Sequence, residues 1–117
     1  MTKSGLSITE ETRDGVHIIT LAGFLDGHTF IEFERKLDAL FKANKVRLVV
    51  DLGGLTYIAS AGVGAFINGQ HQAKKRNGCL QLSNAGPNIQ EIFDILGLES
   101  IFTIHPTVAA ALLAAKT

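Results

Sequence analysis

The chain has 117 residues, a length that fits one domain. Hydrophobic residues make up 46% of the chain and charged residues 19%, and the formal net charge is +0, which excludes a disordered polypeptide and argues against the basic face of a nucleic-acid-binding protein. The single cysteine, Cys79, excludes an internal disulfide, and no apolar run is long enough to span a membrane, so we expect a cytoplasmic protein without a signal peptide or membrane association.

Hydrophobic periodicity divides the chain into strands and helices. In chain order the predicted elements are strands over 6–12 and 16–21, a helix over 28–44, a strand over 46–52, a helix over 60–78, a strand over 79–84, a helix over 87–98, a strand over 101–104 and a helix over 107–116. The order ββαβαβαβα, with strands and helices alternating in the second half, predicts an α/β domain with right-handed crossovers.

Local signals mark several of the boundaries. Asp14-Gly15 is typical of the tight turn of a hairpin. Thr29 followed by Glu32 has the spacing of a capping box at the start of the first helix. Gly97 is placed to end the third helix in a left-handed conformation.

The apolar residues in helical or strand phase predict a single core. On the first helix the predicted inward face contains Phe30, Phe33, Leu37, Leu40 and Phe41, and on the third helix Ile89, Ile92, Phe93 and Leu96. Val49 from the buried strand and Ile67 from the second helix complete the expected core.

Ser60 is the main candidate functional residue, because it follows a buried strand and opens a helix. One interpretation is an N-cap whose hydroxyl accepts a bond from a free helix N–H group. Another is a phosphate acceptor, because free N–H groups and the helix dipole favour an anion there and Ala59, Ala61 and Gly62 leave room for another protein to reach the hydroxyl. A nucleophile is disfavoured, because the segment lacks the G-x-S-x-G pattern and the four histidines are scattered.

Signals for cofactors and metals are weak. Gly62-Val63-Gly64 resembles the start of a dinucleotide fingerprint, but position 67 is Ile67 instead of glycine, and no Walker A pattern occurs. No two histidines or acids have ligand spacing with Cys79, which we expect to be a small buried hydrophobe. We therefore expect no catalytic residue, no cofactor and no metal.

Four segments match, in order, the motifs of one known domain family. VVDLGGLTYIASAGVGAF, residues 49–66, resembles the family signature, and LAGFLDGHTF, residues 21–30, resembles its Gly-Glu-Leu-Asp-x-x-Thr segment. NIQEIFDILGLESIF and the alanine-rich VAAALLAA resemble its last two helices. The family that these segments resemble is the STAS domain family of bacterial anti-sigma factor antagonists. The resemblance covers Leu6 to Ala115 and identifies the chain as a single STAS domain over residues 1–117.

The resemblance implies a mixed sheet of four to five strands with about four helices mainly on one face. It implies an anti-sigma factor antagonist that binds an anti-sigma factor of the ATPase type, which is also a serine kinase. The kinase switches the antagonist off by phosphorylating the serine that corresponds to Ser60, and a serine phosphatase resets it. The protein would be a monomer or a weak homodimer with no direct contact to nucleic acid.

Two residues depart from the family pattern. Ala59 stands where the family commonly has Asp, which puts the phosphorylation rate and the identity of the partner in question, and Phe24 stands where the family often has Glu. We expect the partner surface to comprise the loop before Ser60, the start of the second helix and the loop after the second strand, because such loops commonly carry function. The predicted partner-binding residues are Phe24, Asp26, His28, Thr56, Tyr57, Ala59, Ala61 and Gly62. Asp26 could equally be a turn or cap acceptor.

A second functional class remains open at this stage. A STAS-type domain can also be a scaffold or interaction module of a stress-signalling assembly or a transporter, without regulation by phosphorylation. Such a module would form complexes that are indifferent to ATP.

Overall fold

The computed structural model describes residues 5–116 of the chain. The predicted domain range of 1–117 and the expected absence of a signal peptide involve residues 1–4 and 117, which lie outside the described residues, so both stay predictions.

The first two strands form the predicted hairpin. Strands β1 (Leu6–Arg13) and β2 (Val16–Leu25) pair antiparallel. The turn residues Asp14 and Gly15 both have positive φ, 55° and 80°, as a two-residue hairpin turn requires. β2 continues four residues beyond the predicted end, and this extension leads directly to the candidate site.

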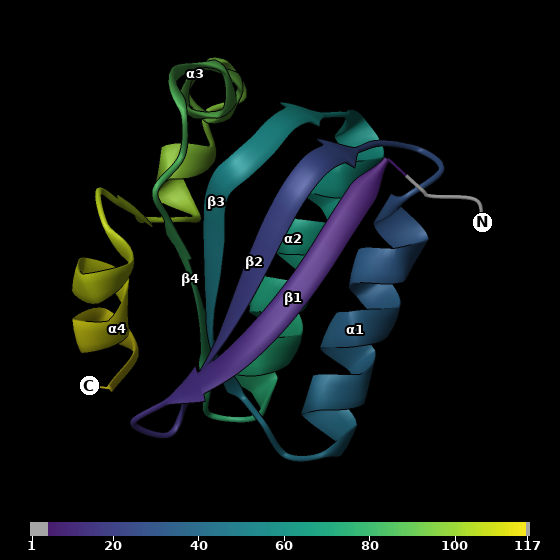
Figure 1. Ribbon diagram of the computed structural model, residues 1–117. Helices are drawn as coiled ribbons and strands as arrows, with labels where there is room; N and C mark the ends of the chain where they lie inside the picture. The colour runs from purple at the N-terminus through teal and green to yellow at the C-terminus, as the bar shows by residue number, and fades with distance from the viewer. Residues whose placement is uncertain (1–4, 117) are drawn as a thin grey trace.

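Three further strands extend the hairpin into a mixed five-stranded sheet (Figure 1). β3 (Arg47–Ile58), β4 (Cys79–Ser83) and β5 (Ile104–His105) are added in parallel, and the spatial order is β1-β2-β3-β4-β5. The helices are α1 (Phe30–Lys42), α2 (Ser60–Lys75), α3 (Pro87–Ile95), the short 3-10 helix η1 (Leu98–Ser100) and α4 (Val108–Lys116). The predicted α/β class and the order ββαβαβαβα are confirmed.

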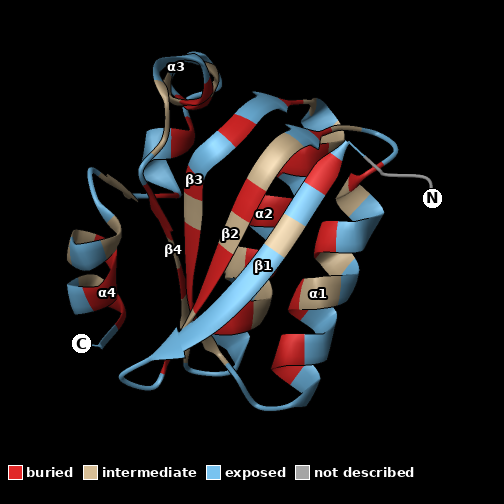
Figure 2. Ribbon diagram, viewed as in Figure 1, coloured by how far each residue is buried: buried red, intermediate tan, exposed pale blue. Residues whose placement is uncertain are grey.

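The helices pack on the two faces of the sheet unequally, as the family resemblance implied. α1, α2 and α3 cover one face, and alternate residues of the central strands, such as Leu48 and Val50, point toward them. α4 lies on the other face over Val16, Ile18 and Val49. The sheet therefore separates two hydrophobic clusters, and the prediction of a single core is wrong. Figure 2 shows that β1 is exposed along most of its length, as expected for an edge strand.

Aromatic rings form the centre of the larger cluster. The ring of Phe66 lies 5.0 Å from Phe33, 6.0 Å from Phe93 and 6.4 Å from Phe102, measured between centroids, in tilted or edge-to-face arrangements. Because these four residues come from α1, α2, α3 and the segment before β5, their contacts fix the three helices on this face against one another.

Most core predictions hold, and two do not. On the first helix Phe33, Leu37, Leu40 and Phe41 are buried, and Phe30 packs partly buried against them. Ile67 is 38% exposed, because it lies 100° around α2 from the buried Phe66. Leu96 is 54% exposed, because α3 ends at Ile95 and the chain then turns away through Gly97, whose φ is 68° as predicted.

The described helices are also short by the standard of a bilayer. None of those within residues 5–116 is both long and apolar enough to cross a membrane.

Candidate functional site

The candidate site lies where β2 and β3 end and α2 begins, at one edge of the sheet (Figure 1). Phe24 pairs with Tyr57 and Leu25 with Ile58 in the parallel register. The N–H of Ala59 donates to the carbonyl of Leu25 at 2.9 Å, which joins the end of β2 to the start of α2. The two segments that the sequence analysis singled out, 24–28 and 56–62, are therefore neighbours in space.

Ser60 is the first residue of α2, and it is exposed. The predicted N-cap role is wrong. Ala59 is the N-cap, with extended φ and ψ of −100° and 172°, and its carbonyl accepts the first helical bond from Val63 at 3.1 Å. The serine is one position later than expected because β3 continues to Ile58 and leaves one residue between strand and helix. Its hydroxyl is therefore not needed as the cap of this helix.

Gly62 sets how closely α2 approaches β2. A Cβ atom placed on Gly62 would lie 2.8 Å from Leu25 Cγ, 2.9 Å from the Leu25 carbonyl oxygen and 3.0 Å from Ile58 Cγ1. Gly64, two residues later, has open space in the same test, with nothing within 4 Å. Gly62 is buried, so it acts by letting the helix start lie against the strand ends that carry the rest of the site.

The segment before Ser60 is a strand and not the expected loop. Thr56 and Tyr57 belong to β3, and Gly54 continues the strand by lying opposite Ala22, where a Cβ would come within 2.9 Å of the alanine side chain. The register shifts between Gly23 and Phe24, and the Thr56 hydroxyl donates to the Gly23 carbonyl at 3.1 Å. This bulge leaves two consecutive residues, Thr56 and Tyr57, exposed.

Asp26 and Thr29 hold the loop between β2 and α1. Asp26 Oδ1 accepts the backbone N–H groups of His28 at 2.9 Å and Thr29 at 3.0 Å. The Thr29 hydroxyl donates to the Phe24 carbonyl at 2.8 Å and accepts the Asp26 N–H at 2.9 Å. The N–H of His28, and next that of Thr29, hold the pKa of the Asp26 carboxyl below its usual value.

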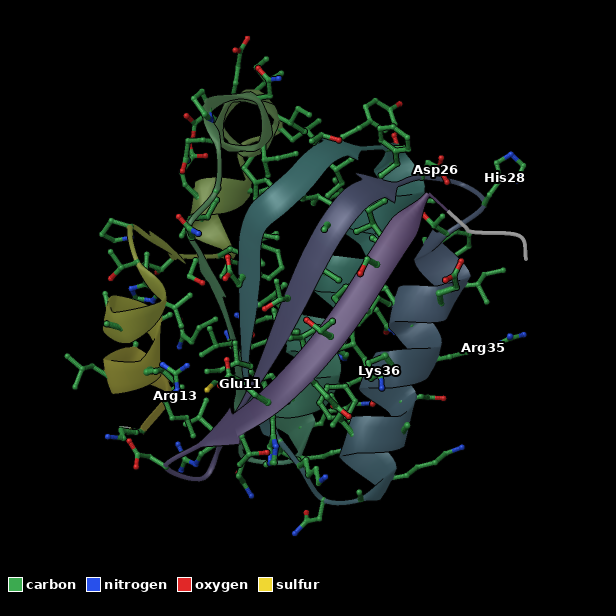
Figure 3. The ribbon with its side chains drawn as sticks, viewed as in Figure 1. Glu11, Arg13, Asp26, His28, Arg35 and Lys36 are labelled. Carbon is green, nitrogen blue, oxygen red and sulfur yellow. The ribbon has the colours of Figure 1, made fainter. Side chains whose placement is uncertain are left out.

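These bonds decide between the interpretations of this loop. The expected role of Asp26 as a turn acceptor is confirmed, while its contact with a partner stays a prediction. The Thr29 hydroxyl makes no cap bond to α1, so the capping box predicted from Thr29 is wrong. Thr29 is 4% exposed and ties the loop to β2, a role that sequence reasoning missed although the Asp-x-x-Thr spacing was visible. Figure 3 shows Asp26 and His28 on this loop, with His28 pointing away from the body of the molecule.

Large apolar side chains stand beside these polar groups. Phe24 is 50% exposed and Tyr57 49% exposed, on neighbouring strands and in register. The predicted partner-binding residues are therefore gathered at one edge, with Gly62 beneath and Ala59 and Ala61 half-buried around Ser60.

The groups around Ser60 determine what its hydroxyl can do chemically. Ser60 has no hydrogen bond to a histidine or carboxylate of residues 5–116 that could activate it. Within the same residues no three His, Cys, Asp or Glu side chains are grouped so that they could hold a metal ion. An exposed hydroxyl at the positive end of α2, with no acidic residue in the first turn, is instead a position where a phosphate is tolerated.

Comparisons with known proteins agree on one family. The family model of the STAS domain matches residues 7–111. The chain is 33% identical over 112 residues, 96% of its length and 97% of the relative's, to "Putative anti-sigma factor antagonist BtrV" of Bordetella bronchiseptica. An anti-sigma factor antagonist from Mycobacterium paratuberculosis has a similar structure, with a TM-score of 0.86, 24% identity and coverage of 96% of this chain and 95% of the other. Phosphorylated SpoIIAA, a Bacillus cell fate determinant, has a TM-score of 0.70, 21% identity and coverage of 91% and 96%.

Proposed function

The chain belongs to the STAS domain family, and from this premise we propose that it is an anti-sigma factor antagonist controlled by phosphorylation of Ser60. In its unphosphorylated form it binds an anti-sigma factor and so frees a sigma factor for transcription. The anti-sigma factor is a serine kinase of the ATPase type, and its phosphorylation of Ser60 dissociates the complex. A serine phosphatase then removes the phosphate, so that the antagonist can bind again. The chain itself acts as a binding protein and not as an enzyme.

The observation that carries this proposal is the position of the Ser60 hydroxyl. It is exposed at the first position of a 16-residue helix, between the small side chains of Ala59 and Ala61. Another protein's active site can reach such a hydroxyl, and the helix N-terminus favours the charge of about −1.5 to −2 that a phosphate adds. Phosphorylation should therefore leave the fold intact.

The same phosphate is unfavourable in a complex. The neighbours of Ser60 on this edge include Phe24 and Tyr57, so a partner that covers them would also enclose the serine. A dianion enclosed there would be desolvated and would collide with a surface fitted to a hydroxyl. A cost of about 2–3 kcal/mol would weaken binding roughly a hundredfold.

The test combines the chain with a candidate kinase and ATP and locates phosphate by mass spectrometry. We expect phosphate on Ser60, lost in Ser60→Ala and retained in the control Ser100→Ala, which removes another exposed serine. Ser60→Ala should bind the kinase constitutively, whereas Ser60→Asp should bind weakly and unfold at the wild-type temperature. Phosphate found only at other residues, or a tight complex that ATP leaves unchanged, would instead favour the scaffold or transporter module.

The predicted contacts of Phe24 and Asp26 are tested in the same binding assay. Each alanine variant should weaken the complex with the kinase, because both residues lie on the edge that carries Ser60. Unchanged affinity in both variants would place the partner surface elsewhere.

A further inference from the structure

A groove between β3 and α3 is lined partly by exposed apolar side chains. Its volume is about 300 Å³, and we call it the β3–α3 groove. It is lined by Thr56 and Tyr57 from β3 and by Asn88, Glu91, Ile92 and Ile95 from α3. Tyr57 is 49% exposed and Ile95 73% exposed, so neither side chain is buried in the core of the domain. Contiguous exposed apolar surface of this kind commonly marks an interaction site.

The groove-lining residues of α3 form one regular stripe. Positions 88, 91, 92 and 95 follow the spacing i, i+3, i+4, i+7, which places them on one side of the helix. The adjacent side of α3 provides core contacts through Ile89 and Phe93, each 1% exposed, and Ile92, at the border of the stripe, packs partly buried against the same core. Within the stripe, Ile95 is therefore the apolar side chain that the domain leaves exposed, beside the polar Asn88 and Glu91.

The charged side chain that lines the groove is acidic. It is Glu91, and the other lining residues are uncharged. Asp94 and Glu99 line a different pocket, with Phe93 and Phe102. Between Arg76 and Lys116 the chain contains no lysine or arginine. Cationic side chains are found at other places in the domain, for example on α1, where Arg35 and Lys36 are labelled in Figure 3, and at the end of α2.

We propose that the β3–α3 groove binds an amphipathic helix of a partner protein, with an apolar stripe flanked by lysine or arginine. The exposed side chains of Tyr57 and Ile95 can receive the apolar side chains of a second helix, and Glu91 complements its basic flanks. The groove adjoins the site described above, because Tyr57 lies three residues before Ser60 and pairs with Phe24. Only the identity of the partner, the anti-sigma factor, rests on the proposed function.

The binding chemistry can be tested without the natural partner. The probe is a fluorescent helical peptide of about 14 residues, roughly 20 Å long, with leucine on one face and lysine on the other. Its control carries glutamate in place of lysine. We expect anisotropy titrations to show binding of the lysine peptide only, with affinity that falls as salt is raised.

Matched variants locate the binding site. Ile95→Ser should weaken peptide binding roughly tenfold, a factor that corresponds to about 1.4 kcal/mol and is typical of burying much of one isoleucine. Leu113→Ser, which changes a 67% exposed leucine on α4, should leave binding unchanged. Glu91→Gln should weaken binding and reduce its salt dependence, and the control Asp38→Asn on α1 should not. Because Ile95 and Leu113 are exposed, both serine variants should unfold at the wild-type temperature.

Three outcomes would overturn the proposal. Equal losses in Ile95→Ser and Leu113→Ser, or equal binding of the glutamate peptide, would show that the groove is not the site. Self-association of the wild-type protein that Ile95→Ser abolishes would show that a second copy covers the groove. Ser60→Asp separates this inference from the proposed function, because it should weaken binding of the whole anti-sigma factor but leave peptide binding at least as strong.

Discussion

Two glycines near the start of α2 provide a matched test of how this helix is positioned. An alanine Cβ at position 62 would lie 2.8 Å from Leu25 Cγ and 2.9 Å from the Leu25 carbonyl oxygen, whereas position 64 has nothing within 4 Å. Favourable contacts between such atoms lie at about 3.5–4.0 Å, so Gly62→Ala requires α2 and β2 to separate by roughly 0.5–1 Å. Overpacking of this kind typically costs about 1–3 kcal/mol of unfolding free energy.

Helix propensity has the opposite effect on the unfolding free energy. Because both variants replace glycine by alanine in the same helix, this contribution nearly cancels when the two variants are compared. Alanine favours a helix over glycine by about 1 kcal/mol. We therefore expect Gly64→Ala to raise the unfolding free energy by up to about 1 kcal/mol and Gly62→Ala to lower it by up to about 2 kcal/mol. The difference between the variants measures the contact of α2 with the end of β2.

Urea unfolding followed by circular dichroism checks this expectation, provided that the dependence of the free energy on urea is the same in both variants. Gly62→Ala should also weaken partner binding, because Ser60 lies on the helix turn that has to move. Equal stabilisation by both substitutions would refute the reasoning, since it would show that the first turn of α2 has room against Leu25.

Three further predictions follow from single residues. Ala59→Asp should raise the unfolding free energy by about 0.5–2 kcal/mol in the same urea assay, because Ala59 occupies the N-cap position and its side chain cannot accept a bond; no gain would show that the helix start is capped in another way. Phe93→Ala should lower the unfolding free energy by about 3–5 kcal/mol, because the ring is 1% exposed and lies 6.0 Å from the rings of both Phe66 and Phe102; a change well under 1 kcal/mol would mean that Phe93 is outside the core. An NMR titration should give the Asp26 carboxyl a pKa below its ordinary 3.8. The stability that this carboxylate contributes is then present above pH 3.8 and is lost as the pH falls through the lowered pKa. A titration midpoint at or above 3.8 would contradict the hydrogen bonds from His28 and Thr29.

The family and the main architecture could be predicted from the sequence because their signals are local. Alternation of apolar residues, the Asp14-Gly15 turn and the stripe of Phe33, Leu37 and Phe41 depend on neighbours within a few residues along the chain. The same holds for Gly97, where the left-handed conformation follows from the residue type and its place after an apolar helix. Motifs in a fixed order then pointed to the STAS family, which the family model matches over residues 7–111.

The position of Ser60 in its helix was decided by tertiary structure. The local sequence Gly53-Gly54 favours a loop. In the structure, β2 lies alongside and its residues pair with this segment, so β3 continues to Ile58. This moves the N-cap to Ala59 and leaves Ser60 with a hydroxyl that the helix does not use. The Asp26–Thr29 network likewise depends on the carbonyl of Phe24, whose position is set by the strand that precedes the loop.

Which apolar residues remain exposed was also decided only when the elements packed. α3 carries four large apolar residues that the sequence does not distinguish: Ile89, Ile92, Phe93 and Ile95. Their helical phase spreads them around more than one side of the helix. Phase alone does not say which side meets the sheet. Contact with the core buries Ile89 and Phe93 and partly buries Ile92, whereas Ile95, in the open groove beside β3, stays 73% exposed. The sequence by itself thus determined the elements and the family, and the long-range pairing of β2, β3 and α3 determined which side chains are presented to a partner, because such pairing depends on contacts between residues far apart in the chain.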